Sequence, residues 1–151
     1  MNKKKIFVST LGCPKNLVDT EIFCGNLARN GFRLVDDLSL ADVAIVNTCS
    51  FIKEAREETY REIQDLCRYK EHHHRGLCLI ITGCLLKNRS VSLLKKRFPC
   101  ADAFVSPEEY VRFAEILGLV TRQAGKKMKR GARVFSKGKS VFQSFRPEEY
   151  R

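Results

Sequence analysis

The feature that most constrains the fold is a regular alternation of short apolar runs with longer segments of helical period. The clearest candidate strands are residues 6–9, 43–46 and 77–82. Strands that alternate with amphipathic helices are typical of repeated βα units built around a parallel sheet. The run 43–46 is apolar throughout, as expected of a central strand that is covered by helices on both faces.

The remaining elements fit the same order. We expect short strands at 32–35 and 103–105, and helices from about residue 17 to 30, 51 to 70 and 90 to 98. A final helix is predicted to begin at Ser106-Pro107-Glu108-Glu109, as N-cap, first-turn proline and capping box, and to end at Gly118. The side chains predicted to face the core are those of Val18, Ile22, Leu27, Ile52, Ala55, Thr59, Ile63 and Leu66. The predicted fold class is therefore α/β, an open and mostly parallel flavodoxin-like sheet with helices on both faces.

The charge is unevenly distributed along the chain. The 151 residues carry a net charge of +11, of which +8 lies in residues 119–151, +1 in residues 1–75 and +2 in residues 76–118. Residues 119–151 also lack a sustained apolar period. We therefore expect an α/β domain over residues 1–118 and a basic, largely irregular linker or tail over residues 119–151.

The chain has seven cysteines, and their chemistry depends on whether the compartment is oxidising or reducing. No apolar run is long enough for an export signal or a membrane span, so the sequence predicts a cytoplasmic protein without membrane contact. A disulfide framework is disfavoured in that setting. Four cysteines are predicted to have no metal-binding role: three as buried thiols and the last in a loop, namely Cys24, Cys67, Cys78 and Cys100.

Cys13, Cys49 and Cys84 share a different context, because each follows a predicted buried strand. Loops at the carboxyl ends of neighbouring parallel strands meet at one edge of the sheet, where ligands of such folds bind. Three thiolates at this edge could hold a metal or an iron–sulfur cluster. Zinc is the weaker candidate, because structural zinc sites usually show local CxxC pairs and this chain has none. Three unrelated cysteines remain the alternative at this point.

Two enzymes of similar topology are disfavoured by the first loop. A low-molecular-weight phosphatase or arsenate reductase needs CxxxxxR there, but the sixth residue after Cys13 is Asp19. A flavodoxin needs a phosphate loop rich in Ser and Thr, and here Pro14 removes one of the amides that would bind the phosphate.

Three stretches resemble the amino-terminal domain of the radical-SAM methylthiotransferases. They are residues 9–21 (STLGCPKNLVDTE), 41–52 (ADVAIVNTCSFI) and 81–84 (ITGC). The form LGCPKNLVDTE is most similar to the branch that modifies an aspartate of a small-subunit ribosomal protein, and the tRNA-modifying branch is the alternative.

The resemblance implies that Cys13, Cys49 and Cys84 bind an auxiliary 4Fe–4S cluster with one open iron that carries the sulfur to be transferred. In the family, a separate domain with a CxxxCxxC motif cleaves S-adenosylmethionine, and that motif does not occur here. This chain is therefore not expected to turn over alone. The implied partner is a ribosomal protein. An alternative function of a different class is a stand-alone ribosome-binding or RNA-binding module. In that case the basic tail would contact phosphates.

Overall fold

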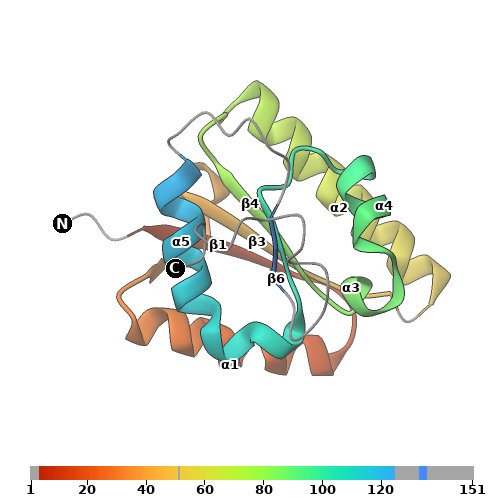
Figure 1. The fold of residues 1–151 in the computed structure, drawn as a ribbon, viewed down its shortest axis with the longest axis horizontal. Coiled ribbons are helices and arrows are strands. Elements are labelled where there is room, and N and C mark those ends of the chain that lie inside the picture. The colour runs from red at the N-terminus through yellow and green to blue at the C-terminus, as the bar shows by residue number, and fades with distance from the viewer. Residues whose placement is uncertain (1–3, 51, 125–132, 136–151) are drawn as a thin grey trace.

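The computed structural model describes residues 4–50, 52–124 and 133–135 as an α/β fold (Figure 1). The strands are β1 (Lys5–Thr10), β2 (Arg33–Leu34), β3 (Val43–Thr48), β4 (Cys78–Gly83), β5 (Ala103–Val105) and β6 (Arg133–Phe135). The α-helices are α1 (Pro14–Arg29), α2 (Lys53–His72), α3 (Leu85–Asn88), α4 (Val91–Arg97) and α5 (Phe113–Ala124). Two 3₁₀ helices are η1 (Leu38–Leu40) and η2 (Pro107–Arg112).

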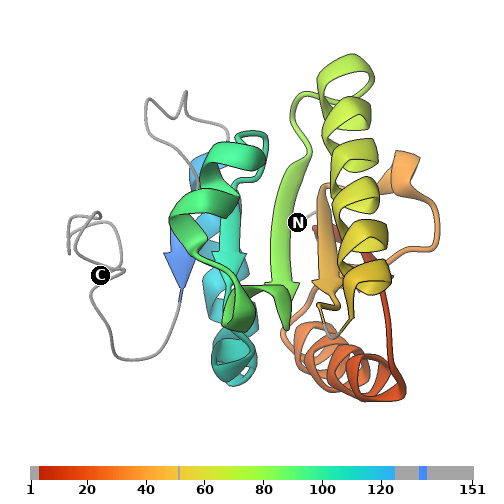
Figure 2. The same ribbon diagram turned by 90° about the vertical axis from the view of Figure 1, so that its right-hand side faces the viewer.

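The six strands form one sheet in the order β2-β1-β3-β4-β5-β6, and every neighbouring pair is parallel. In Figure 2 the arrowheads of β3, β4, β5 and β6 all point the same way. The first five strands follow the 2-1-3-4-5 order of the flavodoxin-like sheet. The predicted fold class is therefore confirmed.

Side chains of β3 and β4 alternate between two apolar layers. Val43 and Ile45 pack in the layer that includes residues of α1 and α5, whereas Ala44 and Val46 pack in the layer that includes residues of α2 and α4. All six residues of β3 are buried. The continuous apolar run of the sequence thus marks a strand covered on both faces, as predicted.

Helix α1 is rotated relative to the prediction. Leu27 is buried as expected, but Val18 and Ile22 are 52% and 59% exposed. The positions facing the sheet also include the polar residues Asn16 and Thr20. The prediction was wrong for Val18 and Ile22 because these polar residues form hydrogen bonds at the end of the sheet, which fixes the face that α1 turns inward.

Helix α2 agrees better with the sequence pattern. Thr59, Ile63 and Leu66 are buried and Ala55 is half-buried. Ile52 is 51% exposed, contrary to the prediction, because it is the N-cap residue and precedes the first turn.

The end of the last predicted helix also differs. Helix α5 passes through Gly118 and continues to Ala124. A glycine inside a helix costs about 1 kcal/mol, whereas burying a side chain such as that of Val120, which is fully buried, gains about 1.5–3 kcal/mol. Upstream, Ser106 is the N-cap of η2 and makes no side-chain capping bond, so the predicted capping box is absent from this described segment.

Part of the predicted tail is regular. Residues 119–124 belong to helix α5, and β6 adds a strand to the sheet. The predictions for residues 125–132 and 136–151 lie outside the described residues.

Candidate functional site

The three candidate cysteines lie directly beyond the carboxyl ends of adjacent strands. Cys13 is the N-cap residue of α1 and follows the loop after β1. Cys49 follows β3, and Cys84 follows β4. Because β1, β3 and β4 are neighbours in the sheet, the three loops lie side by side. This is the edge at which ligands bind in doubly wound sheets.

Asn16 connects all three loops from the first turn of α1. Its side-chain nitrogen donates to the carbonyl of Leu11 over 2.8 Å and to the carbonyl of Thr48 over 2.7 Å. Its side-chain oxygen lies 3.8 Å from the sulfur of Cys84. The side chain of Asn47 donates in turn to the Asn16 carbonyl over 3.0 Å. Asn16 is only 1% exposed, so these bonds are made away from solvent, where a lost partner is costly.

Asn47 extends this polar network into the sheet. Its side-chain nitrogen also donates to the hydroxyl oxygen of Thr20 over 2.9 Å, and that oxygen lies 2.8 Å from the hydroxyl of Thr10. The side-chain oxygen of Asn47 has no hydrogen-bond partner among the described residues. The end of β3 is thereby connected to both β1 and α1 through side chains.

Two glycines allow the loops to approach each other. Gly12 has φ +90°, and a Cβ atom built on it would lie 2.3 Å from the Cβ of Cys49. Gly83 has φ +103°, and its added Cβ would lie 2.5 Å from the backbone nitrogen of Thr48. Only glycine adopts such φ values without strain, and only the absence of a side chain leaves room for the neighbouring loop.

The three thiols differ in exposure. Cys13 is exposed, Cys84 is half-buried, and Cys49 is 4% exposed. Thr59 of α2 holds the buried Cys49 in place, because its hydroxyl donates to the Cys49 carbonyl over 2.8 Å and accepts from the Cys49 amide over 3.2 Å. The site thus has a closed side toward α2 and an open side at Cys13.

The start of α1 favours negative charge. Hydrogen bonding from the backbone amide of Asn16 lowers the pKa of the Cys13 thiol, with smaller contributions from the amide and the charge of Lys15. The pKa of Lys15 is raised, chiefly by its hydrogen bond to Asp19 over 3.2 Å and further by the nearby Cys84 and Cys13. A helix N-terminus and a cation are the surroundings that stabilise a thiolate.

The other thiols lie elsewhere, as predicted for Cys24 and Cys78. Cys78 is buried in β4. Cys24 is half-buried in α1, and burial raises the pKa of its thiol to about 11.

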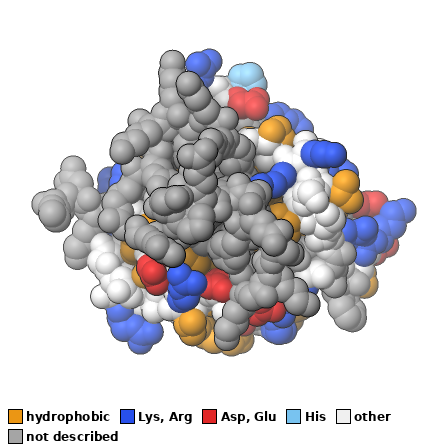
Figure 3. All heavy atoms as spheres, in the orientation of Figure 1, with side chains coloured by type: hydrophobic (Ala, Val, Ile, Leu, Met, Phe, Trp, Pro, Cys, Tyr) orange, Lys and Arg blue, Asp and Glu red, His pale blue; other side chains and the backbone are white. Residues whose placement is uncertain are grey.

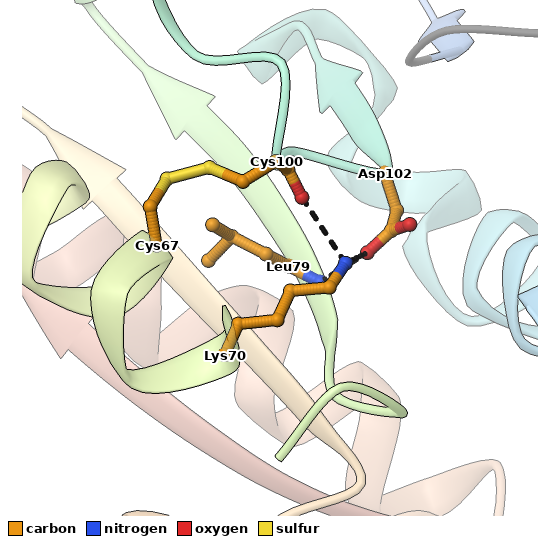
Figure 4. Close-up of a disulfide and its surroundings, with 5 residues drawn as sticks. All are labelled: Cys67, Lys70, Leu79, Cys100 and Asp102. Atoms are coloured by element: carbon orange, nitrogen blue, oxygen red, sulfur yellow. Dashed lines mark hydrogen bonds and ion pairs between the residues drawn. A yellow bond between two sulfur atoms is a disulfide. The ribbon is translucent and has the colours of Figure 1, made fainter. Parts of the chain in front are cut away.

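Cys67 and Cys100 form a disulfide, so the prediction that disulfides are disfavoured and that Cys67 is a buried thiol was wrong for this pair (Figure 4). Their Cα atoms are 5.7 Å apart, although 33 positions separate them in the sequence. The bond joins the end of α2 to the segment before β5, at the amino edge of the sheet and therefore away from the three cysteine loops. Lys70, one turn after Cys67, donates to the carbonyl of Cys100 and pairs with Asp102. No local spacing signals this pair, because only the packing of α2 beside β5 brings the two residues together.

Within the described part of the chain, no three His, Cys, Asp or Glu side chains lie close enough to hold one metal ion. None of the described helices is long and apolar enough to cross a membrane.

Sequence reasoning identified the three cysteine loops but missed Asn16, Asn47 and Thr59. A weak signal was available for Asn47, because an amide that directly ends an apolar strand must find partners inside the fold.

Comparison with known proteins gives a family match and a set of relatives. Residues 5–106 match the model of "Uncharacterized protein family UPF0004". The protein named ribosomal protein uS12 methylthiotransferase RimO is 46% identical over 115 residues in Geotalea uraniireducens and 47% identical over 117 residues in Trichlorobacter lovleyi. The protein of the same name from Acetivibrio thermocellus is 40% identical over 115 residues. Each match covers 76% of this chain and 25% of the relative. The chain therefore spans about a quarter of the length of these curated relatives.

Proposed function

The chain belongs to the uncharacterized protein family UPF0004, and we propose that it is the iron–sulfur cluster domain of a ribosomal-protein methylthiotransferase. The observation that carries the proposal is the connection of three cysteine loops through the single buried side chain of Asn16. The names of the relatives favour the ribosomal-protein branch over the tRNA-modifying one.

Cys13, Cys49 and Cys84 are the proposed ligands of a 4Fe–4S cluster. Iron–sulfur clusters are held by thiolates, and the three free thiols stand at the ends of adjacent strands. Cys13, Cys49 and Cys84 would each bind the cluster through the thiolate sulfur. When bound, the cluster would supply the transferred sulfur from an iron that no cysteine occupies.

The surrounding residues suit such a group. Backbone amides at the start of α1, together with Lys15, favour the negative charge of a thiolate cluster. Gly12 and Gly83 leave the space between the loops free of side chains. Asn16 and Thr59 hold the loops through the backbone, so they act as positioning residues.

The substrate proposal follows the relatives, which are named for ribosomal protein uS12. S-adenosylmethionine would act only through a separate radical domain, because the CxxxCxxC motif is absent from this chain. A ribosomal substrate places the activity in the cytoplasm. Contact between RNA and the basic tail stays a prediction, because most of the tail lies outside the described residues.

Anaerobic reconstitution with iron and sulfide tests the ligand set. We expect the wild-type chain to take up one 4Fe–4S cluster, seen as a broad visible absorption band and as the matching iron and sulfide content. The variants Cys13→Ala, Cys49→Ala and Cys84→Ala should each lose most of the bound iron and keep the circular dichroism of the folded chain.

Cys24→Ala is the matched control, because this thiol lies in α1 outside the three loops. It should retain the wild-type iron content. A wild-type chain that takes up no cluster would contradict the proposal, as would full iron content in all three ligand variants.

A further inference from the structure

One segment on a second surface of the domain is strongly basic. Residues 85–100 contain five Lys or Arg residues and no Asp or Glu. These residues form α3, α4 and the turn that follows, all on the α2 side of the sheet. In Figure 3, Lys and Arg side chains are visible on the right-hand side of the molecule, where Figure 1 places α2 and α4, together with acidic side chains. The nearly balanced charge of the domain as a whole conceals this concentration.

A groove lies between α2 and α4 on this surface. It has a volume of about 470 Å³ and is lined by Tyr60, Arg89, Leu93, Leu94, Lys96 and Arg97. The guanidinium of Arg97 stacks over the Tyr60 ring at 4.1 Å, and Leu93 is 63% exposed. The groove therefore combines cations with an aromatic ring and an apolar side chain that faces solvent.

The positive charges of the groove are not neutralised by carboxylates among the described residues. Arg89, Lys96 and Arg97 make no ion pair with any carboxylate in the described part of the chain. Cations that neutralise phosphates release counterions from a nucleic acid, and aromatic rings stack on its unpaired bases. A segment of acidic residues alone would use the cations but has no ring that stacks on Tyr60.

We propose that this groove binds a single-stranded segment of RNA, with Arg89 and Lys96 facing phosphates and the stacked Arg97–Tyr60 pair and Leu93 beside a base. The choice of RNA among polyanions rests on the proposed function, because a ribosomal-protein substrate belongs to an RNA-containing particle. Helix α3 starts directly after Cys84, and its C-cap residue Arg89 lines the groove. RNA bound here would hold the domain beside the substrate protein.

Fluorescence anisotropy with a labelled uridine dodecamer tests this surface, using the cluster-free full chain in about 50 to 200 mM KCl. The double variant Arg89→Glu/Lys96→Glu changes two exposed side chains and should preserve the fold. We expect its affinity to fall at least about tenfold and the slope of log Kd against log salt to fall by about 1.4, because two phosphate contacts are lost. Tyr60→Leu should weaken binding with little change in the slope, because it removes stacking and no charge.

The matched control is Arg29→Glu/Arg33→Glu, which makes the same change of charge at exposed positions near β2, at the far edge of the sheet. It should change the affinity by less than about threefold at equal salt. Wild-type affinity in the groove variant would overturn the proposal, as would loss of binding only on charge reversal of Lys126 and Lys127 in the tail. Competition by polyglutamate as strong as that by RNA would show a surface for acidic protein instead.

The outcome is independent of the cluster assignment. Cys13→Ala, which should fail to hold the cluster, is expected to bind the dodecamer as tightly as the wild type. Failure of cluster uptake with intact RNA binding would remove the first proposal alone, and the reverse result would remove only the second.

Discussion

The side-chain nitrogen of Asn47 donates to the main-chain carbonyl of Asn16 over 3.0 Å, which joins the end of β3 to the first turn of α1. Asn16 extends this hydrogen-bond network, because its own side chain donates to the carbonyls of Leu11 and Thr48. These two amides therefore join the Cys13 loop to the Cys49 loop. Substitution of either should disturb the site and the stability together.

Asn16→Ala is expected to lower the free energy of unfolding by about 2–4 kcal/mol, because it leaves two carbonyls without their side-chain donor at a buried position. Urea denaturation of the cluster-free chain measures this loss. Asn30→Ala is the matched control in the same segment, since its exposed side chain bonds only to the nearby Asn26 carbonyl, and it should cost less than about 0.5 kcal/mol. Equal losses in the two variants would refute the bridging role of Asn16.

Gly12→Ala is expected to destabilise the fold by about 1–3 kcal/mol, because Gly12 has φ +90° and its added methyl would meet the Cβ of Cys49 at 2.3 Å. The displaced Cys49 thiol, which is 4% exposed in the native chain, should also react faster with a thiol reagent. Gly25→Ala is the matched control, because nothing lies within 4 Å of its added Cβ. That change inside α1 should stabilise by about 0.5–1 kcal/mol. A shift of the urea midpoint in the same direction for both substitutions would contradict this role of Gly12.

Reduction of the Cys67–Cys100 disulfide should lower stability by about 2–4 kcal/mol, because the bond closes a long loop in the unfolded chain. Thermal unfolding with and without dithiothreitol measures the effect. Cys67→Ser/Cys100→Ser should unfold at the temperature of the reduced wild type and show no response to reductant. The reduced chain should remain folded, since the Lys70–Asp102 pair still joins α2 to the start of β5. An equal response of the variant and the wild type to dithiothreitol would rule out this bond as the source.

Tyr110 should make stability fall in alkaline solution. Burial raises the pKa of its hydroxyl from the ordinary value of 10.0 to about 12, against a smaller lowering by the hydroxyl of Thr82. The unfolded chain then loses this proton at a lower pH than the folded chain. The stabilisation is complete below pH 10 and is lost as the pH rises toward 12, up to about 2–3 kcal/mol.

Urea unfolding of the wild type and Tyr110→Phe at a series of pH values isolates this effect. Above pH 10 the unfolding free energy of the wild type should fall relative to that of Tyr110→Phe, because phenylalanine has no proton to lose. A difference that stays constant up to the highest pH would show that Tyr110 ionises equally in the folded and unfolded chains.

Much of the fold could be predicted because it depends on local pattern. The apolar runs that became β3 and β4 identify strands covered on both faces, and the intervening helical segments require parallel crossovers. The positions of Cys13, Cys49 and Cys84 beyond their strands follow from this order alone. The continuation of α5 past Gly118 did not follow, because the gain from burying Val120 depends on packing against the sheet.

By itself, the sequence determined most of the strands and helices, and which loops carry the three cysteines of the candidate site. The tertiary structure alone decided that α1 buries Asn16 and Thr20 while Val18 and Ile22 face outward, and that Cys67 meets Cys100. The physical reason is the distance along the chain over which each kind of interaction acts. Apolar periodicity records the burial preference of each segment, whereas hydrogen-bond partners and disulfide partners are set by residues far along the chain that only the assembled sheet brings together.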